Sequence, residues 1–139
     1  MSELKKQLDV CLANTFAMYL KAQTAHWNVQ GPEFYQFHEM FGNIYNEVWT
    51  AVDTIAELIR TLDELAVIQP VSTISEYANE TGGIPNTWAL VQANDAVLAS
   101  LMIAYKLAED DGELGISNAL QDRITAHQKH KWMLKATMK

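Results

Sequence analysis

Residues 69–86 read QPVSTISEYANETGGIPN, and this stretch decides how the segments on either side of it can be arranged. It is bounded by Pro70 and Pro85 and contains the pair Gly82-Gly83, which interrupt regular structure. A turn between two antiparallel helices needs only a few residues, so a connection of this length is expected to cross the fold from one end to the other. Within it, Thr73-Ile74-Ser75-Glu76 matches a capping box and predicts one short helix over residues 75–80.

The segments on both sides of this connection carry apolar residues at helical spacing, and no run alternates every second residue. The sequence therefore predicts an all-α fold. The four long helices are expected at residues 2–28, from near Pro32 onward, from a cap at Asn86 or Thr87 to Gly112, and from residues 115–117 onward. The second of these helices is expected to carry Glu47 and Arg60 on its polar face.

Two helices, a long crossover and two further helices form the ferritin-like variant of the four-helix bundle. Since no repeat, low-complexity run or composition change divides the chain, residues 1–139 are expected to form a single domain with a short extra helix in the crossover. This architecture by itself leaves the function open.

Composition narrows the classes of partner. The chain has 139 residues, a formal net charge of -7 and one cysteine, Cys11, which is expected to be a small buried apolar residue. The negative charge disfavours binding to a polyanion and suits attraction of cations. The N-terminal residues do not read as the apolar core of a secretion signal, and no uncharged apolar run reaches the length of a membrane span. The sequence therefore predicts a cytoplasmic protein without a membrane partner.

Four residues carry the chemistry: His26, His38, Asp53 and Glu57. Asp53 and Glu57 are four residues apart on the second helix, so their carboxylates share one face and can bind a cation together. Such a pair is most often a solvated helix face, and that alternative stays open. His26 and His38 flank the break at Gly31, where antiparallel packing can bring them close together.

The two pairs cannot meet within one chain. His38 and Asp53 are fifteen residues apart on one predicted helix, which separates them by about 22 Å along its axis. If they share a metal, the histidines of one chain must meet the carboxylates of another, most simply across a two-fold axis. Imidazole and carboxylate ligands suit iron. The chain has no Glu-x-x-His motif, the pattern of bundles that hold two irons within one chain.

At this point the sequence resembles the Dps mini-ferritins over essentially its whole length. The motifs that carry the resemblance are AHWNVQGPEF at residues 25–34, FHEMF at residues 37–41, VDTIAE at residues 52–57 and HKWML at residues 130–134. The resemblance implies a dodecameric homo-oligomer, with His26, His38, Asp53 and Glu57 as iron-binding and catalytic residues across a dimer interface. It also implies oxidation of Fe(II) by hydrogen peroxide, in preference to oxygen, and storage of the ferric product.

The chain departs from the family pattern at Gly42, where Dps proteins usually place an aspartate ligand. We expect weaker iron binding, or a site that depends more on its second metal position, with Asn43, Asn46, Glu47 or water as replacements for the missing ligand. A shell with weak or lost ferroxidase activity, acting in storage, structure or DNA association, therefore stays open as an alternative. DNA binding itself is not expected, since the sequence lacks the lysine-rich tail on which it commonly rests in the family.

Three further features have two interpretations each. The acidic run at residues 109–113 either lines a pore through which cations enter the shell, as in the family, or is a solvated turn. Asn118 stands where that pore often has an aspartate in the family. Trp27, beside the first histidine, is either a radical quencher or an interface aromatic residue. His127 and His130 form a His-x-x-His pair, for which packing is favoured over metal binding.

Overall fold

The computed structural model describes residues 2–67 and 84–139. These residues form four α-helices and no strand: α1 (Glu3–Asn28), α2 (Phe34–Thr61), α4 (Thr87–Asp110) and α5 (Leu114–Ala136). The all-α prediction is confirmed, and each helix boundary lies within a few residues of the expected one. The short helix predicted over residues 75–80 lies outside the described residues.

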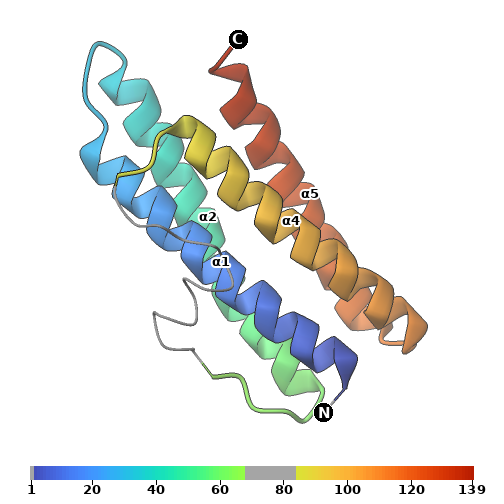
Figure 1. Cartoon of the computed structure of the whole chain (residues 1–139). Helices are drawn as coiled ribbons and strands as arrows, with labels where there is room; N and C mark the ends of the chain where they lie inside the picture. The colour runs from blue at the N-terminus through green and yellow to red at the C-terminus, as the bar shows by residue number, and fades with distance from the viewer. Residues whose placement is uncertain (1, 68–83) are drawn as a thin grey trace.

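The helices form two antiparallel pairs, α1 with α2 and α4 with α5, packed side by side (Figure 1). Helix α2 ends at the lower end of the bundle in Figure 1, whereas α4 begins at the upper end. The end of α2 and the start of α4 therefore lie at opposite ends of the bundle, which is the arrangement that a long connection was expected to serve. Helix α1 packs against both α2 and α4, while α2 and α5 touch only sparsely.

Local chemistry at the termini sets the helix boundaries. The Ser2 hydroxyl accepts a hydrogen bond from the backbone N–H of Lys5 at 3.1 Å, which starts α1. The side-chain oxygen of Asn86 accepts one from the N–H of Ala89 at 2.8 Å, which starts α4. Gly31, with φ at +109°, makes the turn between α1 and α2 in a conformation that other residues rarely adopt.

The core lies between the two helix pairs and is built from the predicted apolar stripes. Its fully buried large side chains are Leu4, Leu8, Met18, Ile55, Ile59, Leu90, Leu101, Leu120 and Leu134. Cys11 is also buried, and its Sγ lies 3.3 Å from the Ser100 carbonyl. Burial raises the pKa of this thiol to about 12, so it behaves as the small buried residue that was expected.

An ionic network crosses the bundle between α2 and α5. Both guanidinium nitrogens at the end of Arg123 donate to the Glu47 carboxylate, and His130 Nε2 donates to it at 2.8 Å. Glu47, expected on the polar face of α2, keeps 37% of its side chain exposed but turns its carboxylate toward α5. Its neighbours on α5 come from 76 and 83 residues later, a pairing that periodicity along one helix cannot reveal.

His127 extends this network into the core. Its Nε2 accepts from Arg123 at 2.8 Å, and its Nδ1 donates to the Asn94 side chain at 2.8 Å. The Asn94 amide in turn donates to the His127 carbonyl at 2.7 Å. His127 and His130 are thus buried and held by hydrogen bonds, as the favoured packing interpretation predicts.

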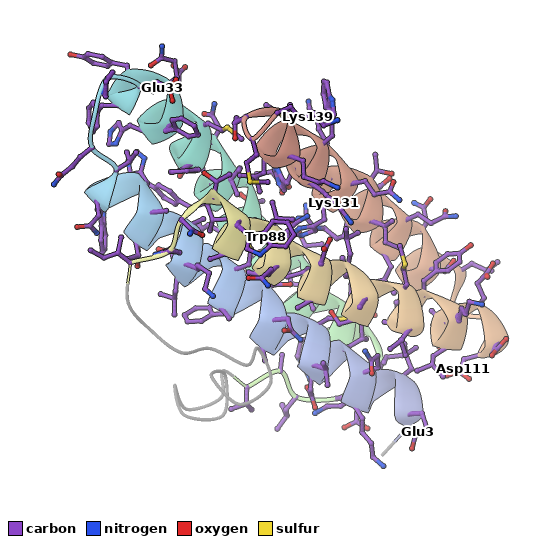
Figure 2. The ribbon with its side chains drawn as sticks, turned by 45° about the horizontal axis from the view of Figure 1, so that its top comes forward. Glu3, Glu33, Trp88, Asp111, Lys131 and Lys139 are labelled. Atoms are coloured by element: carbon purple, nitrogen blue, oxygen red, sulfur yellow. The ribbon has the colours of Figure 1, made fainter. Side chains whose placement is uncertain are left out.

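The surface keeps large apolar side chains exposed. All four tryptophans are more than half exposed: Trp27 at 64%, Trp49 at 53%, Trp88 at 52% and Trp132 at 68%. Figure 2 labels Trp88 near the start of α4. Tryptophan is enriched at protein interfaces, where one end of the ring is buried and the other end stays wet.

Helix α4 is, among the described helices, the one that is long and apolar enough to cross a membrane by length and composition. Within its most apolar stretch, 44% is buried inside the bundle. A core helix of a bundle meets the same criteria, so its apolar character follows from its packing.

Candidate metal centre

His26 and His38 face each other at the turn between α1 and α2. Their rings stack with centroids 3.8 Å apart and planes inclined by 16°. His26 Nδ1 lies 2.6 Å from the His38 carbonyl oxygen, and His38 Nδ1 lies 2.8 Å from the His26 carbonyl oxygen. The antiparallel packing thus brings the two predicted histidines together and locks each ring to the backbone of the other.

These two hydrogen bonds decide which nitrogen can bind a metal. A carbonyl oxygen only accepts, so Nδ1 of each ring must carry the proton. The neutral ring then has its lone pair on Nε2, and within the described part of the chain no hydrogen bond engages either Nε2. A backbone carbonyl on one imidazole nitrogen with a metal on the other is the usual arrangement of a metal-binding histidine.

Gly42 makes room for the His26 ring. A Cβ at position 42 would lie 3.0 Å from His26 Cε1 and 3.1 Å from His26 Nδ1, closer than most such contacts. The position where a carboxylate ligand was expected is therefore covered by the first histidine. Glu47 cannot replace that ligand from its present position, because Arg123 and His130 occupy its oxygens.

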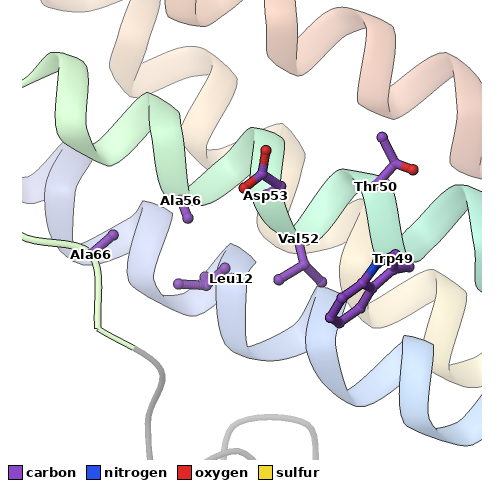
Figure 3. Close-up of a pocket in the computed structure, with 7 residues that line it drawn as sticks. All are labelled: Leu12, Trp49, Thr50, Val52, Asp53, Ala56 and Ala66. Atoms are coloured by element: carbon purple, nitrogen blue, oxygen red, sulfur yellow. The ribbon is translucent and has the colours of Figure 1, made fainter.

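The two carboxylates lie further along α2, and both are exposed. Asp53 raises the pKa of Glu57 through a hydrogen bond between the carboxyl groups and through the repulsion of their charges. A bound cation would relieve that repulsion. Asp53 also lines a hollow of about 480 Å³ beside Trp49, Leu12 and Ala66 (Figure 3).

The chain does not bring the histidine pair and the carboxylate pair together. All but His26 lie on the continuous helix α2, and the fifteen residues from His38 to Asp53 correspond to about 22 Å along its axis. Within residues 2–67 and 84–139, no group of three or more His, Cys, Asp or Glu side chains is close enough to hold one metal ion. Each pair supplies half of the residues that were predicted to bind iron, and the two are called here the histidine half-site and the carboxylate half-site.

Sequence reasoning missed two features of the histidine half-site. One is the contact between Gly42 and His26, which no spacing rule reveals. The other is Tyr45, whose ring lies edge-on to His26 with centroids 5.1 Å apart. Tyr45 is seven residues after His38 on α2, and this two-turn spacing was a usable signal that it faces the same side.

Comparison with known proteins assigns the family. The model of the ferritin-like domain matches residues 5–139, nearly the whole chain. The "DNA protection during starvation protein" of Brevibacillus brevis is 28% identical over 130 residues, covering 90% of this chain and 87% of that protein. The chain belongs to the ferritin-like family and is a Dps-type protein.

Two further proteins are similar to this Dps-type chain, one in sequence and one in both sequence and structure. The "General stress protein 20U" of Bacillus subtilis (strain 168) is 32% identical, and the alignment covers 96% of both chains. The crystal structure of the Dps protein of Vibrio cholerae O1, described as one of the ferritin-like diiron-carboxylate proteins, is 29% identical. It superposes with a TM-score of 0.89 over 99% of this chain and 89% of that one. The predicted ferritin-like bundle is thereby confirmed.

Proposed function

We propose that this Dps-type chain is an iron-storage ferroxidase that protects against oxidative damage. It binds Fe(II) between His26 and His38 of one subunit and Asp53 and Glu57 of another. Two Fe(II) ions reduce one hydrogen peroxide with two protons, giving two Fe(III) ions and two waters; oxygen is the slower oxidant. The ferric product is stored inside a dodecameric shell, and peroxide is consumed without releasing radicals.

The observation that carries this proposal is the reciprocal hydrogen bonding of the two histidines. Each Nδ1 is held by the opposite carbonyl, so both Nε2 atoms are ready to bind a metal without a change of tautomer. Two nitrogen donors and two carboxylates suit iron and leave positions for an oxidant. Peroxide and iron bound together in this way can exchange electrons directly.

Assembly completes the site in this proposal. The carboxylate half-site lies beside a hollow lined by Trp49, and Trp27, next to the first histidine, is 64% exposed. A two-fold dimer that brings Trp27 and the histidines of one subunit to the carboxylates of another would cover both surfaces and form two equivalent sites. The main role of Trp27 in this dimer is to pack as an aromatic residue in the interface.

The same proposal places the protein in the cytoplasm and without DNA as a partner. Lys5, Lys6 and Lys131 pair with Asp9, Glu3 and Asp95, and the net charge of the chain is -7. The repulsion between this net charge and the phosphates of DNA disfavours binding. A gel-shift assay at low salt should show no retardation of duplex DNA.

The test is oxidation of Fe(II) by peroxide, followed by ferric absorbance and by the size of the iron-loaded particle. The double variant D53N/E57Q should lose most of the rate, because it removes the charged oxygens of one half-site. Its matched control is Asp122→Asn, which neutralises an exposed carboxylate on α5. Equal rates in D53N/E57Q and the wild type would rule out the proposed site.

One observation favours a second candidate, a Dps shell with weak ferroxidase activity. Gly42 supplies no ligand, and the His26 ring lies over it. Anaerobic titration with Fe(II) separates the candidates: the main proposal requires saturable binding at the dimer sites that D53N/E57Q abolishes. A shell with weak ferroxidase activity would show the same weak, non-saturating uptake in both proteins.

A further inference from the structure

A continuous row of aromatic rings leaves the histidine half-site and runs along the α1–α2 pair. The ring of His26 contacts Tyr45, with centroids 5.1 Å apart. Tyr45 contacts Tyr19 at 6.0 Å, and Tyr19 contacts Trp49 at 4.9 Å. Neighbouring rings in the row are thus at the separations of direct aromatic contact, without an aliphatic residue between them.

The row ends at the other half-site of the same subunit. Trp49 lines the same hollow as Asp53 (Figure 3), and it precedes Asp53 by four residues, which is about one helical turn. The three rings between the half-sites are tyrosine or tryptophan, the side chains that lose an electron most readily. Phenylalanine, which does not, occurs beside the row at Phe16 but not within it.

We infer that Tyr45, Tyr19 and Trp49 form an electron relay between the two half-sites of each subunit. The inference rests on the proposed function. In a two-fold dimer the histidines of one subunit belong to the first iron site, and the carboxylates of that subunit belong to the second. The relay therefore joins the two iron sites of the dimer, so that they share electrons.

This connection answers a difficulty that Gly42 creates. A site with one ligand fewer is suited to one iron ion, which supplies one electron, whereas peroxide needs two electrons for full reduction. One Fe(II) ion alone converts peroxide to hydroxide and a hydroxyl radical, with only one electron transferred. With the relay, the Fe(II) ion at the second site supplies the other electron.

The step balances in atoms and charge. Peroxide bound at the first site takes one electron from its own Fe(II) and one from Tyr45; its O–O bond breaks, and two protons complete two waters. Tyr45 gives up its phenolic proton to water and becomes a neutral radical. The Tyr45 radical is reduced by an electron from Tyr19, which in turn takes one from Trp49, and Trp49 takes one from the Fe(II) ion of the second site. A proton from water returns to the phenol of Tyr45. The sum is two Fe(III) ions and two waters from one peroxide.

The test is the yield of hydroxyl radicals during iron oxidation. Tyr45→Phe keeps a ring beside His26 but cannot be oxidised at a phenol, so spin-trapped hydroxyl radical per peroxide should rise several-fold, counted per Fe(II) bound. Tyr19→Phe should act in the same way. The matched control is Tyr105→Phe on α4, outside the row, which should release no more radical than the wild type. A wild-type yield in Tyr45→Phe, with iron still oxidised, would overturn the relay.

A second measurement needs no iron, and so it separates failure of the relay from failure of the proposed function. Azide radicals made by pulse radiolysis oxidise tryptophan in the metal-free protein, and the growth of tyrosyl absorbance then reports transfer from Trp49. Trp49→Phe should remove the fast part of that growth, and Trp88→Phe should not. If the wild type fails to oxidise iron, the proposed function falls; absence of Trp49-dependent transfer overturns the relay in either case.

Discussion

At Gly42, helix α2 leaves space for an imidazole ring that any side chain would partly fill. A methyl group there would lie 3.0 Å from His26 Cε1, so the ring must shift by a few tenths of an ångström. That shift weakens the hydrogen bond from His26 Nδ1 to the His38 carbonyl, which depends steeply on geometry. The glycine is thus a positioning residue for the first histidine.

Gly42→Ala should bind Fe(II) roughly tenfold more weakly, which corresponds to about 1.4 kcal/mol. Folding stability should not fall, because alanine is favoured over glycine inside a helix by about 1 kcal/mol. Anaerobic Fe(II) titration and urea unfolding measure the two effects. Gly115→Ala is the control, since an added Cβ there has nothing within 4 Å. Unchanged affinity in Gly42→Ala would contradict the positioning role.

His127 gives the bundle a defined sensitivity to acid. Its burial, reinforced by the charges of Arg123 and His130, lowers the pKa of this imidazole to about 3. The unfolded chain takes up the proton at a pKa of about 6.5. Between these two pKa values the unfolded chain binds one more proton than the folded protein. The contribution of His127 to the free energy of unfolding is therefore full above about pH 6.5 and is lost progressively as the pH falls toward 3.

His127→Gln should flatten this pH dependence. Between about pH 6.5 and 5 the wild type should lose about 1.4 kcal/mol of unfolding free energy per pH unit through this residue. The free energy of unfolding of the variant is lower at neutral pH, because the variant loses hydrogen bonds to Asn94 and Arg123. Its decrease with falling pH should be less steep, because one fewer proton is taken up on unfolding. Urea unfolding at one protein concentration measures both slopes. Parallel slopes would show that another group dominates.

At the scale of the elements, the helices were predictable because their signals are local. Ser2 and Asn86 are capping residues, and both cap the helices that they were expected to start. The approach of His26 to His38 also followed from a short turn between two long helices. The Glu47 network did not, since its partners lie on a helix distant in sequence. Likewise, no spacing rule reveals that each histidine donates to the other's carbonyl.

The cap of α4 is the element-level feature open to direct test. The Asn86 side chain satisfies the Ala89 N–H at 2.8 Å, just where the chain returns from the crossover. Asn86→Ala should therefore lower the free energy of unfolding by about 1 kcal/mol. Asn86→Asp keeps the acceptor oxygen and should retain most of the stability. Thermal unfolding of the three proteins tests this ranking, and equal destabilisation by Ala and Asp would argue against the cap.

For the whole molecule, the length of α2 is the deciding quantity. One straight helix, Phe34–Thr61, carries His38 near its start and both carboxylates in its second half. No side-chain movement closes a gap of about 22 Å. A shared iron site therefore requires that two copies of the chain exchange half-sites. Trp27, next to the first histidine, and Trp49, beside Asp53, offer exposed aromatic surface for that contact.

Mixing two inactive variants tests that exchange. H26A/H38A lacks the histidine half-site, and D53N/E57Q lacks the carboxylate half-site, so neither forms a complete site alone. In a mixed dimer, one of the two sites combines both damaged halves, whereas the other combines both intact halves. Unfolding and refolding the variants together should therefore restore part of the peroxide-driven Fe(II) oxidation, and mixing them without subunit exchange should not. If each site were built within one chain, no mixture would recover activity, because every chain would still carry a damaged half.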